Sequence, residues 1–220
     1  MKKIIVACQT LQDEVEAVLK QQGQDIPIVW IPSGLHNVPS TLTAKLQETL
    51  DALEPTDLVL LAMAYCGNSV QGVKTGNYQL VIPRMDDCIS LLLGKVKAHE
   101  DTYKGHYFLT AGWIRGERNL VVEYQHVLEK YGEKRGKMIY KTMLRHYTHI
   151  AMLNSGCFDT APTEEEVRRT ADLLGMQYRE VAADLTLLRQ LLEGPWPNSL
   201  FLTVPPHTEI TSQMLTLANQ

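Results

Sequence analysis

Three cysteines stand at or just past the ends of apolar stretches, and they carry the strongest chemical signal in the sequence. The stretches are residues 4–8, 58–64 and 80–82, and the cysteines are Cys8, Cys66 and Cys88. Thiolates are soft ligands, so three of them brought together would bind zinc, an iron–sulfur cluster or another thiophilic metal. A cluster held by three protein thiolates leaves one iron open to a substrate. The sequence has no Cys-x-x-Cys pair, so the convergence of the three thiols depends on the fold.

Two other interpretations of these cysteines remain open. A free cysteine often behaves as a small buried hydrophobic residue, in which case at least one of the three belongs to the core. Alternatively, two cysteines on opposing loops would act as acid and base at a carbon next to a carboxylate, which Arg84 would hold in its guanidinium fork. Cys157 lies in a different setting, Asn154-Ser-Gly-Cys157, and is not expected to be a fourth ligand.

Polar side chains accompany the cysteines. His36 follows Gly34 and Leu35 and would serve as a fourth ligand or as a general acid–base, unless it caps a helix or faces solvent. Arg84 has an anionic ligand or the carboxylate of Asp87 as its best partner. Asp87 either belongs to the site or N-caps the helix that follows it.

A glycine-containing loop and a tryptophan complete the candidate site. Residues 67–76 contain three glycines but lack the spacing of a phosphate-binding loop, so the segment beginning at Gly67 would admit a bulky cofactor. Thr110 and Trp113 would provide an aromatic wall for that cofactor, unless Trp113 is a core residue.

The elements that must position these residues alternate between strand and helix. Apolar, β-branched runs predict strands, and apolar residues at helical spacing predict helices between them. This rhythm favours an α/β fold with a mostly parallel sheet and helices on both faces, in which ligands bind at the carboxyl ends of the strands. The predicted strands are residues 3–7, 26–31, 58–64, 79–82 and 107–110, and the predicted helices are residues 11–22, 40–53 and 89–93.

The C-terminal half is expected to be a mostly helical insertion, residues 115–195. Helical spacing over residues 117–147 is interrupted by Gly132 and Gly136. Thr163 and Glu166 form a capping box for a helix that ends before Gly175. Residues 150–153 would form a short strand, residues 181–192 a mostly helical segment, and residues 200–204 a late strand.

Composition narrows the class of protein. The 220 residues fit one domain, residues 1–220, with an ordinary hydrophobic content of 45%. A net charge of -4 and a pI near 6.0 give no reason to expect nucleic acid or a membrane surface, and no apolar run reaches the ~20 residues that span a bilayer. The N-terminus does not look like a secretory signal. We therefore expect a cytoplasmic protein with free thiols. The basic residues within 130–145 are interpreted mainly as the solvated face of a helix.

The motifs around the cysteines resemble a bacterial and archaeal family catalogued as domain of unknown function 1638. The resemblance implies a cytoplasmic, single-domain protein of anaerobes, often found beside corrinoid-dependent methyltransferase components, with a role in one-carbon or cofactor metabolism. At Ala64 and Ala111 the sequence departs from the residues expected in that family. The matching motifs are Ala7-Cys8 with Glu14, Gly34-Leu-His36, Tyr65-Cys66-Gly67, Ile82-Pro-Arg84 with Asp87-Cys88 and Leu93-Gly94, and Leu109-Thr110 with Gly112-Trp113.

The sequence thus favours a metal- or iron–sulfur-binding protein that acts on a small anionic substrate or cofactor in corrinoid-linked metabolism. It leaves open whether the protein is an enzyme. Two alternatives are an accessory protein that holds a corrinoid or metal for a partner methyltransferase, and a cofactor-independent two-cysteine isomerase. The expected metal ligands are Cys8, Cys66 and Cys88, the expected catalytic residues are His36, Arg84 and Asp87, and the expected cofactor contacts are Gly67, Thr110 and Trp113.

Overall fold

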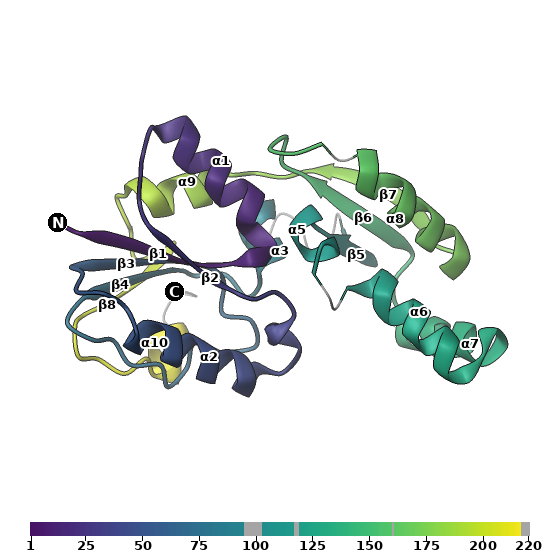
Figure 1. Cartoon of the computed structure of the whole chain (residues 1–220), viewed down its shortest axis with the longest axis horizontal. Helices are drawn as coiled ribbons and strands as arrows, with labels where there is room; N and C mark the ends of the chain where they lie inside the picture. Colours follow the sequence, from purple (N-terminus) through teal and green to yellow (C-terminus); the bar gives the residue numbers. More distant parts are fainter. Residues whose placement is uncertain (95–102, 117–118, 160, 217–220) are drawn as a thin grey trace.

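The first layer of the molecule is a five-stranded sheet. A computed structural model describes residues 1–94, 103–116, 119–159 and 161–216. The strand order is β2-β1-β3-β4-β8, with the first four strands parallel and β8 antiparallel to β4 (Figure 1). The α/β class is therefore confirmed. The strands are β1 (Lys3–Cys8), β2 (Ile28–Ile31), β3 (Leu58–Ala62), β4 (Gln79–Pro83) and β8 (Phe201–Val204).

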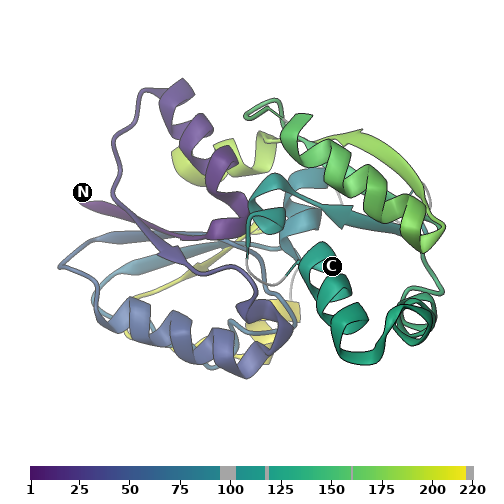
Figure 2. The same cartoon turned by 45° about the vertical axis from the view of Figure 1, so that its right-hand side comes forward.

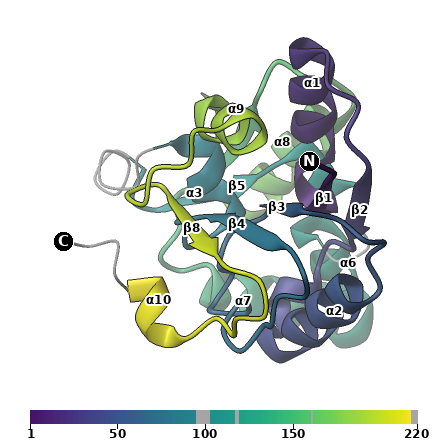
Figure 3. The same cartoon turned by 90° about the vertical axis from the view of Figure 1, so that its left-hand side faces the viewer.

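Helices cover both faces of this sheet, as the near-continuous apolar strands predict. Helices α1 (Gln12–Gln22) and α9 (Thr186–Glu193) lie on one face, and α2 (Pro39–Asp51) and α10 (Ser212–Thr216) on the other (Figures 1 and 3). Successive residues of β1 point to opposite faces, so Ala7 packs with the core beneath α1 and α9, and Cys8 packs with the core beneath α2. Among the described residues, no helix is long and apolar enough to cross a membrane.

The C-terminal half contains a second, three-stranded parallel sheet in the order β5-β6-β7. The helices predicted between residues 117 and 174 pack on this sheet (Figure 2), whereas α9, within the predicted helical segment 181–192, packs on the first sheet. The opposite face of the sheet contributes Ala151, Leu153 and Val181 to the same hydrophobic cluster as Leu91 and Leu92 of the first layer. The elements are β5 (His106–Leu109), β6 (His149–Asn154), β7 (Gln177–Ala182), α3 (Cys88–Leu93), α5 (Ala111–Ile114), α6 (Leu120–Tyr131), α7 (Glu133–Met143) and α8 (Ala161–Leu174).

Several predicted boundaries are correct, and others are wrong for local reasons. Gly132 separates α6 from α7 as expected, whereas Gly136 lies inside α7, where the missing side chain leaves room for Leu128 of α6. Helix α2 begins at Pro39, so Ser40 is not its N-cap. Residue 117, where the helical pattern was expected to begin, lies outside the described residues.

Two further predictions in the C-terminal half are wrong. Helix α8 begins at Ala161, whose backbone N–H donates to Asp159 Oδ1, so Thr163 is inside the helix and forms no capping box. Val181 belongs to strand β7 and not to a helix, because parallel pairing with Leu153 of β6 overrides its local pattern.

The two sheets meet where α5 packs on a short 3-10 helix that follows β1, η1 (Gln9–Leu11). Gly112 of α5 lies so close to η1 that a Cβ atom there would stand 2.5 Å from the Thr10 carbonyl oxygen. Thr110 Oγ1 donates a hydrogen bond to the same carbonyl at 3.3 Å. An ion pair of 2.5 Å between Arg115 and Asp13 lies beside this contact. The strand ends of both sheets are thereby held against each other.

We predict that Gly112→Ala destabilises the protein by about 3 kcal/mol, because the added methyl group overlaps backbone atoms that cannot rotate away. Urea unfolding would measure the loss. The matched control is Gly23→Ala, where nothing lies within 4 Å of the added Cβ and only the left-handed backbone, with φ +62°, carries a cost of about 1 kcal/mol. Equal losses for the two variants would contradict the close contact.

Candidate functional site

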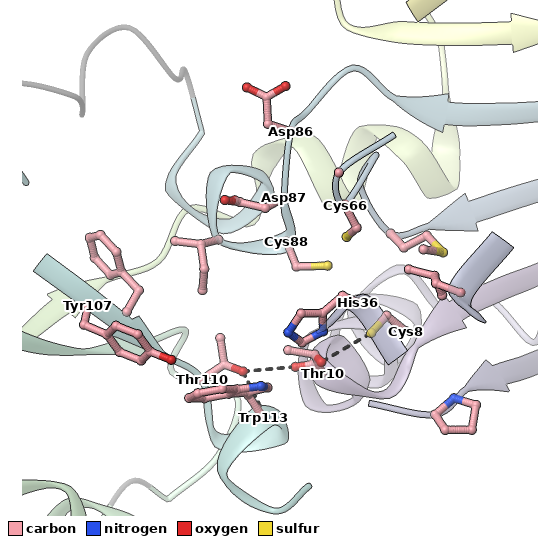
Figure 4. A pocket seen from close by; sticks show the side chains of 16 residues that line it. Cys8, Thr10, His36, Cys66, Asp86, Asp87, Cys88, Tyr107, Thr110 and Trp113 are labelled. Atoms are coloured by element: carbon pink, nitrogen blue, oxygen red, sulfur yellow. Dashed lines mark hydrogen bonds between the residues drawn. The ribbon is translucent and has the colours of Figure 1, made fainter. Parts of the chain in front are cut away.

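The three cysteines line one cavity of about 400 Å³ between the two sheets (Figure 4). Cys8 ends β1, Cys66 lies four residues after β3, and Cys88 begins α3. The side chains of Cys8, Cys66 and Cys88 face one another across this cavity in Figure 4. The structure therefore brings together the three side chains that the sequence proposed as ligands, although their long spacings gave no local reason for it.

Backbone pairing beyond the strands places Cys66 beside Cys88. The Tyr65 and Cys66 N–H groups donate to the carbonyls of Met85 and Asp86 at 2.9 and 2.8 Å, which extends the contact between the chains that leave β3 and β4. Cys66, Gly67 and Asn68 then adopt positive φ angles of 43°, 68° and 64°. A left-handed backbone is unfavourable for Cys66, and such strain is found most often at functional sites.

The proximity of the three cysteines separates their acidities. The neighbouring Cys88 lowers the pKa of Cys8 to about 7 against the opposing effect of burial, and Thr10 assists. The neighbouring Cys66 and Cys8, together with burial, raise the pKa of Cys88 well above its ordinary value. Cys8 is therefore more readily ionised than Cys88 near neutral pH.

His36 and Asp87 also line the cavity. His36 belongs to a 3-10 helix, η2 (Leu35–Asn37), and burial lowers its pKa although the charge of Asp87 opposes the shift, so the imidazole is neutral at pH 7. Asp87 Oδ1 accepts a hydrogen bond from Ser90 N at 2.7 Å and caps α3, which was one of its two predicted roles.

Arg84 is placed elsewhere. It is not among the residues that line the cavity, and its guanidinium donates to the carbonyls of Met214 at 2.8 Å and Phe201 at 3.3 Å. These bonds tie the end of β4 to β8 and α10. The predicted catalytic role of Arg84 therefore finds no support in its surroundings.

The three predicted cofactor contacts all line the cavity. Gly67 forms part of the left-handed turn after Cys66. Thr110 Oγ1 accepts a hydrogen bond from Trp113 N at 3.1 Å and begins α5. The Trp113 ring packs against that of Tyr107, with centroids 5.9 Å apart and planes tilted by 46°. Trp113 thus forms a wall of the cavity, and its Nε1 has no hydrogen-bond partner among the described residues.

Sequence reasoning missed several residues of the cavity. Thr10 accepts a hydrogen bond from the Cys8 thiol at 3.3 Å, and its position two residues after the cysteine was the only available signal. Asp86 stands at the rim beside Asp87. Tyr107 and Phe108 were assigned to a strand without a site role, because nothing local indicates that β5 belongs to a second sheet facing the first.

Glu14, which contributed to the family resemblance, is buried outside the cavity at the junction of the two sheets. Its side chain is 1% exposed, and its Oε1 accepts a hydrogen bond from Ser155 Oγ at 2.9 Å. Burial raises the pKa of Glu14, and the Ser155 hydrogen bond only partly offsets this effect. Cys157 lies on the same loop as Ser155 and does not line the cavity, consistent with its exclusion from the ligand set.

The raised pKa of Glu14 predicts a stability that falls with pH. Its contribution is full below its unfolded-state pKa, near 4.5, and is lost as the pH rises through the higher folded-state pKa, because ionisation then favours unfolding. We expect Glu14→Gln to flatten this part of the stability curve in urea unfolding at several pH values. The control is Glu16→Gln, an exposed position on the same helix. If the stability of Glu14→Gln declines with pH as steeply as that of the parent protein, the decline arises from groups other than Glu14.

The lowered pKa of Cys8 is tested by alkylation. We expect Cys8 to react with iodoacetamide with a midpoint at about pH 7, and Cys88→Ala to move that midpoint upward, since the neighbour that most lowers the pKa of Cys8 is removed. Mass spectrometry of the alkylated peptide across pH gives both midpoints. Cys157→Ala should leave the Cys8 midpoint in place, and an unchanged midpoint in Cys88→Ala would refute the coupling.

The described residues contain no group of three or more His, Cys, Asp or Glu side chains already placed to hold a metal ion. Comparison with known proteins found no match among curated proteins or solved structures. The family model described as "Protein of unknown function (DUF1638)" matches residues 30–192, which includes Cys66, Cys88 and the second sheet. The chain therefore belongs to the DUF1638 family.

Proposed function

We propose that the protein binds a thiophilic metal ion or an iron–sulfur cluster through Cys8, Cys66 and Cys88. The observation that supports this proposal is that the three cysteine side chains line one cavity and face one another there (Figure 4). Soft metals select such a donor set. Metal binding releases the thiol protons, and the Cys8 thiolate already available near pH 7 makes the first of these steps favourable.

The cavity leaves room for a small molecule beside the thiols. Its volume of about 400 Å³ lies within the ~300–1,000 Å³ usual for small-molecule sites. A bound metal would supply Lewis-acid chemistry there. The neutral His36 imidazole is available to accept a proton from a molecule in the cavity, and the negative charge of Asp87 would stabilise the resulting imidazolium.

The link to corrinoid metabolism rests on the family resemblance alone. A corrinoid macrocycle is far larger than the drug-sized molecules that fill cavities of this volume, so the residues around the thiols do not fit a buried corrinoid. A partner methyltransferase or corrinoid protein would have to approach from outside the cavity. The accessory role is therefore less favoured than metal binding by the three thiols themselves.

One observation favours the two-cysteine isomerase as a second candidate, namely the opposite pKa shifts of Cys8 and Cys88. One feature weighs against it. No lysine or arginine of the described chain lines the cavity to hold a carboxylate, and the anionic substrate expected from the sequence lacks support for the same reason.

Metal analysis of anaerobically purified protein tests the proposal directly. We expect either a coloured protein with iron and sulfide or a colourless protein with stoichiometric zinc. Cys66→Ala should lower the metal content or weaken metal affinity by more than about tenfold, because a ligand contributes more than the outer-shell groups whose loss has that effect. Cys157→Ala is the matched control and should retain the metal.

Two results would overturn the metal proposal. The first is a protein that stays metal-free after strictly anaerobic purification and fails to bind added zinc or ferrous iron. The second is a Cys66→Ala variant that folds normally by circular dichroism and binds metal as the parent protein does.

A further inference from the structure

Among the described residues that line the cavity, the charged side chains are carboxylates. Asp86 and Asp87 line it and are exposed to solvent, and the Asp86 carboxylate points away from the thiols in Figure 4. Burial lowers the pKa of His36, so its imidazole is neutral. None of the described lining residues is a lysine or arginine, since Arg84 bonds to backbone carbonyls elsewhere. The cavity therefore attracts cations and repels anions.

Aromatic rings form the wall that the second sheet presents to the thiols. Trp113 and Tyr107 meet at a tilt of 46°, and Phe108 lines the cavity beside them. Figure 4 shows Trp113 below the cavity and Asp87 and Cys88 above it, so a molecule between them faces rings on one side and the Asp87 carboxylate and a protonated thiol on the other. The faces of such rings attract cations, most strongly when the cation is poorly hydrated.

Helix N-termini at the cavity do not reverse this preference. Helices α3 and α5 both begin there, and backbone N–H groups at such ends normally favour anions. Each end is capped by its own chain, because Asp87 accepts from Ser90 N and Thr110 accepts from Trp113 N. The Asp87 carboxylate also brings a full negative charge to the start of α3.

We propose that this cavity binds a small organic cation of the alkylammonium class, with its alkyl groups on Trp113 and Tyr107 and its charge facing Asp87. The inference rests on the proposed function, in that it names the class of molecule that would approach the thiol-bound metal. It departs from the anionic substrate that the sequence favoured, because the arginine on which that expectation depended lies outside the cavity.

Three probes of one shape and different charge test the proposal. Choline carries a trimethylammonium group. Its uncharged carbon analogue is tert-butylethanol (3,3-dimethylbutan-1-ol), and the corresponding anion is 3,3-dimethylbutanoate. Isothermal titration calorimetry of the full chain should give choline a dissociation constant at least about tenfold lower than that of the uncharged analogue, with the anion weakest. Equal affinity of choline and its uncharged analogue, or tighter binding of the anion, would overturn the proposal.

Variants locate the bound cation. Trp113→Leu and Asp87→Asn should each weaken choline binding about tenfold while changing the affinity for tert-butylethanol less, and Asn can still cap α3. If Trp113→Leu fails to fold, Trp113→Phe keeps a ring and should lose only part of the affinity. The control is Glu193→Gln, an exposed carboxylate on α9, which should bind choline as the parent does. Choline binding that all cavity variants retain would place the cation elsewhere and refute the site.

Metal content measured on the same samples separates the two proposals. Metal binding without a preference for choline refutes only the organic cation. Choline binding by a protein that takes up no metal refutes only the thiol metal site, and the cation site then stands by itself. Loss of metal in Cys66→Ala with choline affinity changed less than twofold would support both, since the two ligands then use different parts of the cavity.

Discussion

The close approach of Gly112 to the Thr10 carbonyl is the contact on which the site depends. Cys8 and Thr10 belong to the first sheet and its connection to α1, whereas Thr110 and Trp113 belong to the segment that leaves the second sheet. The absence of a side chain at Gly112 lets α5 rest on η1, and the Thr110 hydroxyl bonds to the same carbonyl. Together with the hydrophobic cluster shared by the two layers, this contact keeps the aromatic wall facing the thiols.

The thiols and their neighbours leave negative charge in the cavity without a positive partner among the described lining residues. The neighbouring Cys88 lowers the pKa of Cys8, and the neutral His36 adds no positive charge of its own. Negative groups therefore gather in a space that is partly closed to water, where electrostatic interactions are stronger than in solvent. A metal ion, an organic cation or both would relieve this imbalance, and the two proposals share that physical origin.

The surroundings of Arg84 in the fold show that its position in the sequence motif does not determine its role. Its position after an apolar strand and before Asp87 and Cys88 resembles that of a ligand-binding arginine. In the fold, β8 runs antiparallel to β4 and presents carbonyl groups that the guanidinium satisfies. The late strand β8 was itself predicted, but its neighbour in the sheet was not, and that pairing decides which groups Arg84 can reach.

Local pattern alone determined the α/β class, most strands of the first sheet, and the placement of Cys8, Cys66 and Cys88 at strand ends, because apolar periodicity and chain turns are encoded by adjacent residues. Only the tertiary structure decided that the three thiols meet, that Val181 joins a second sheet, and that Tyr107 and Trp113 face the cysteines. These facts depend on contacts between residues about a hundred positions apart, such as Thr10 with Gly112, and no local preference specifies such a pairing.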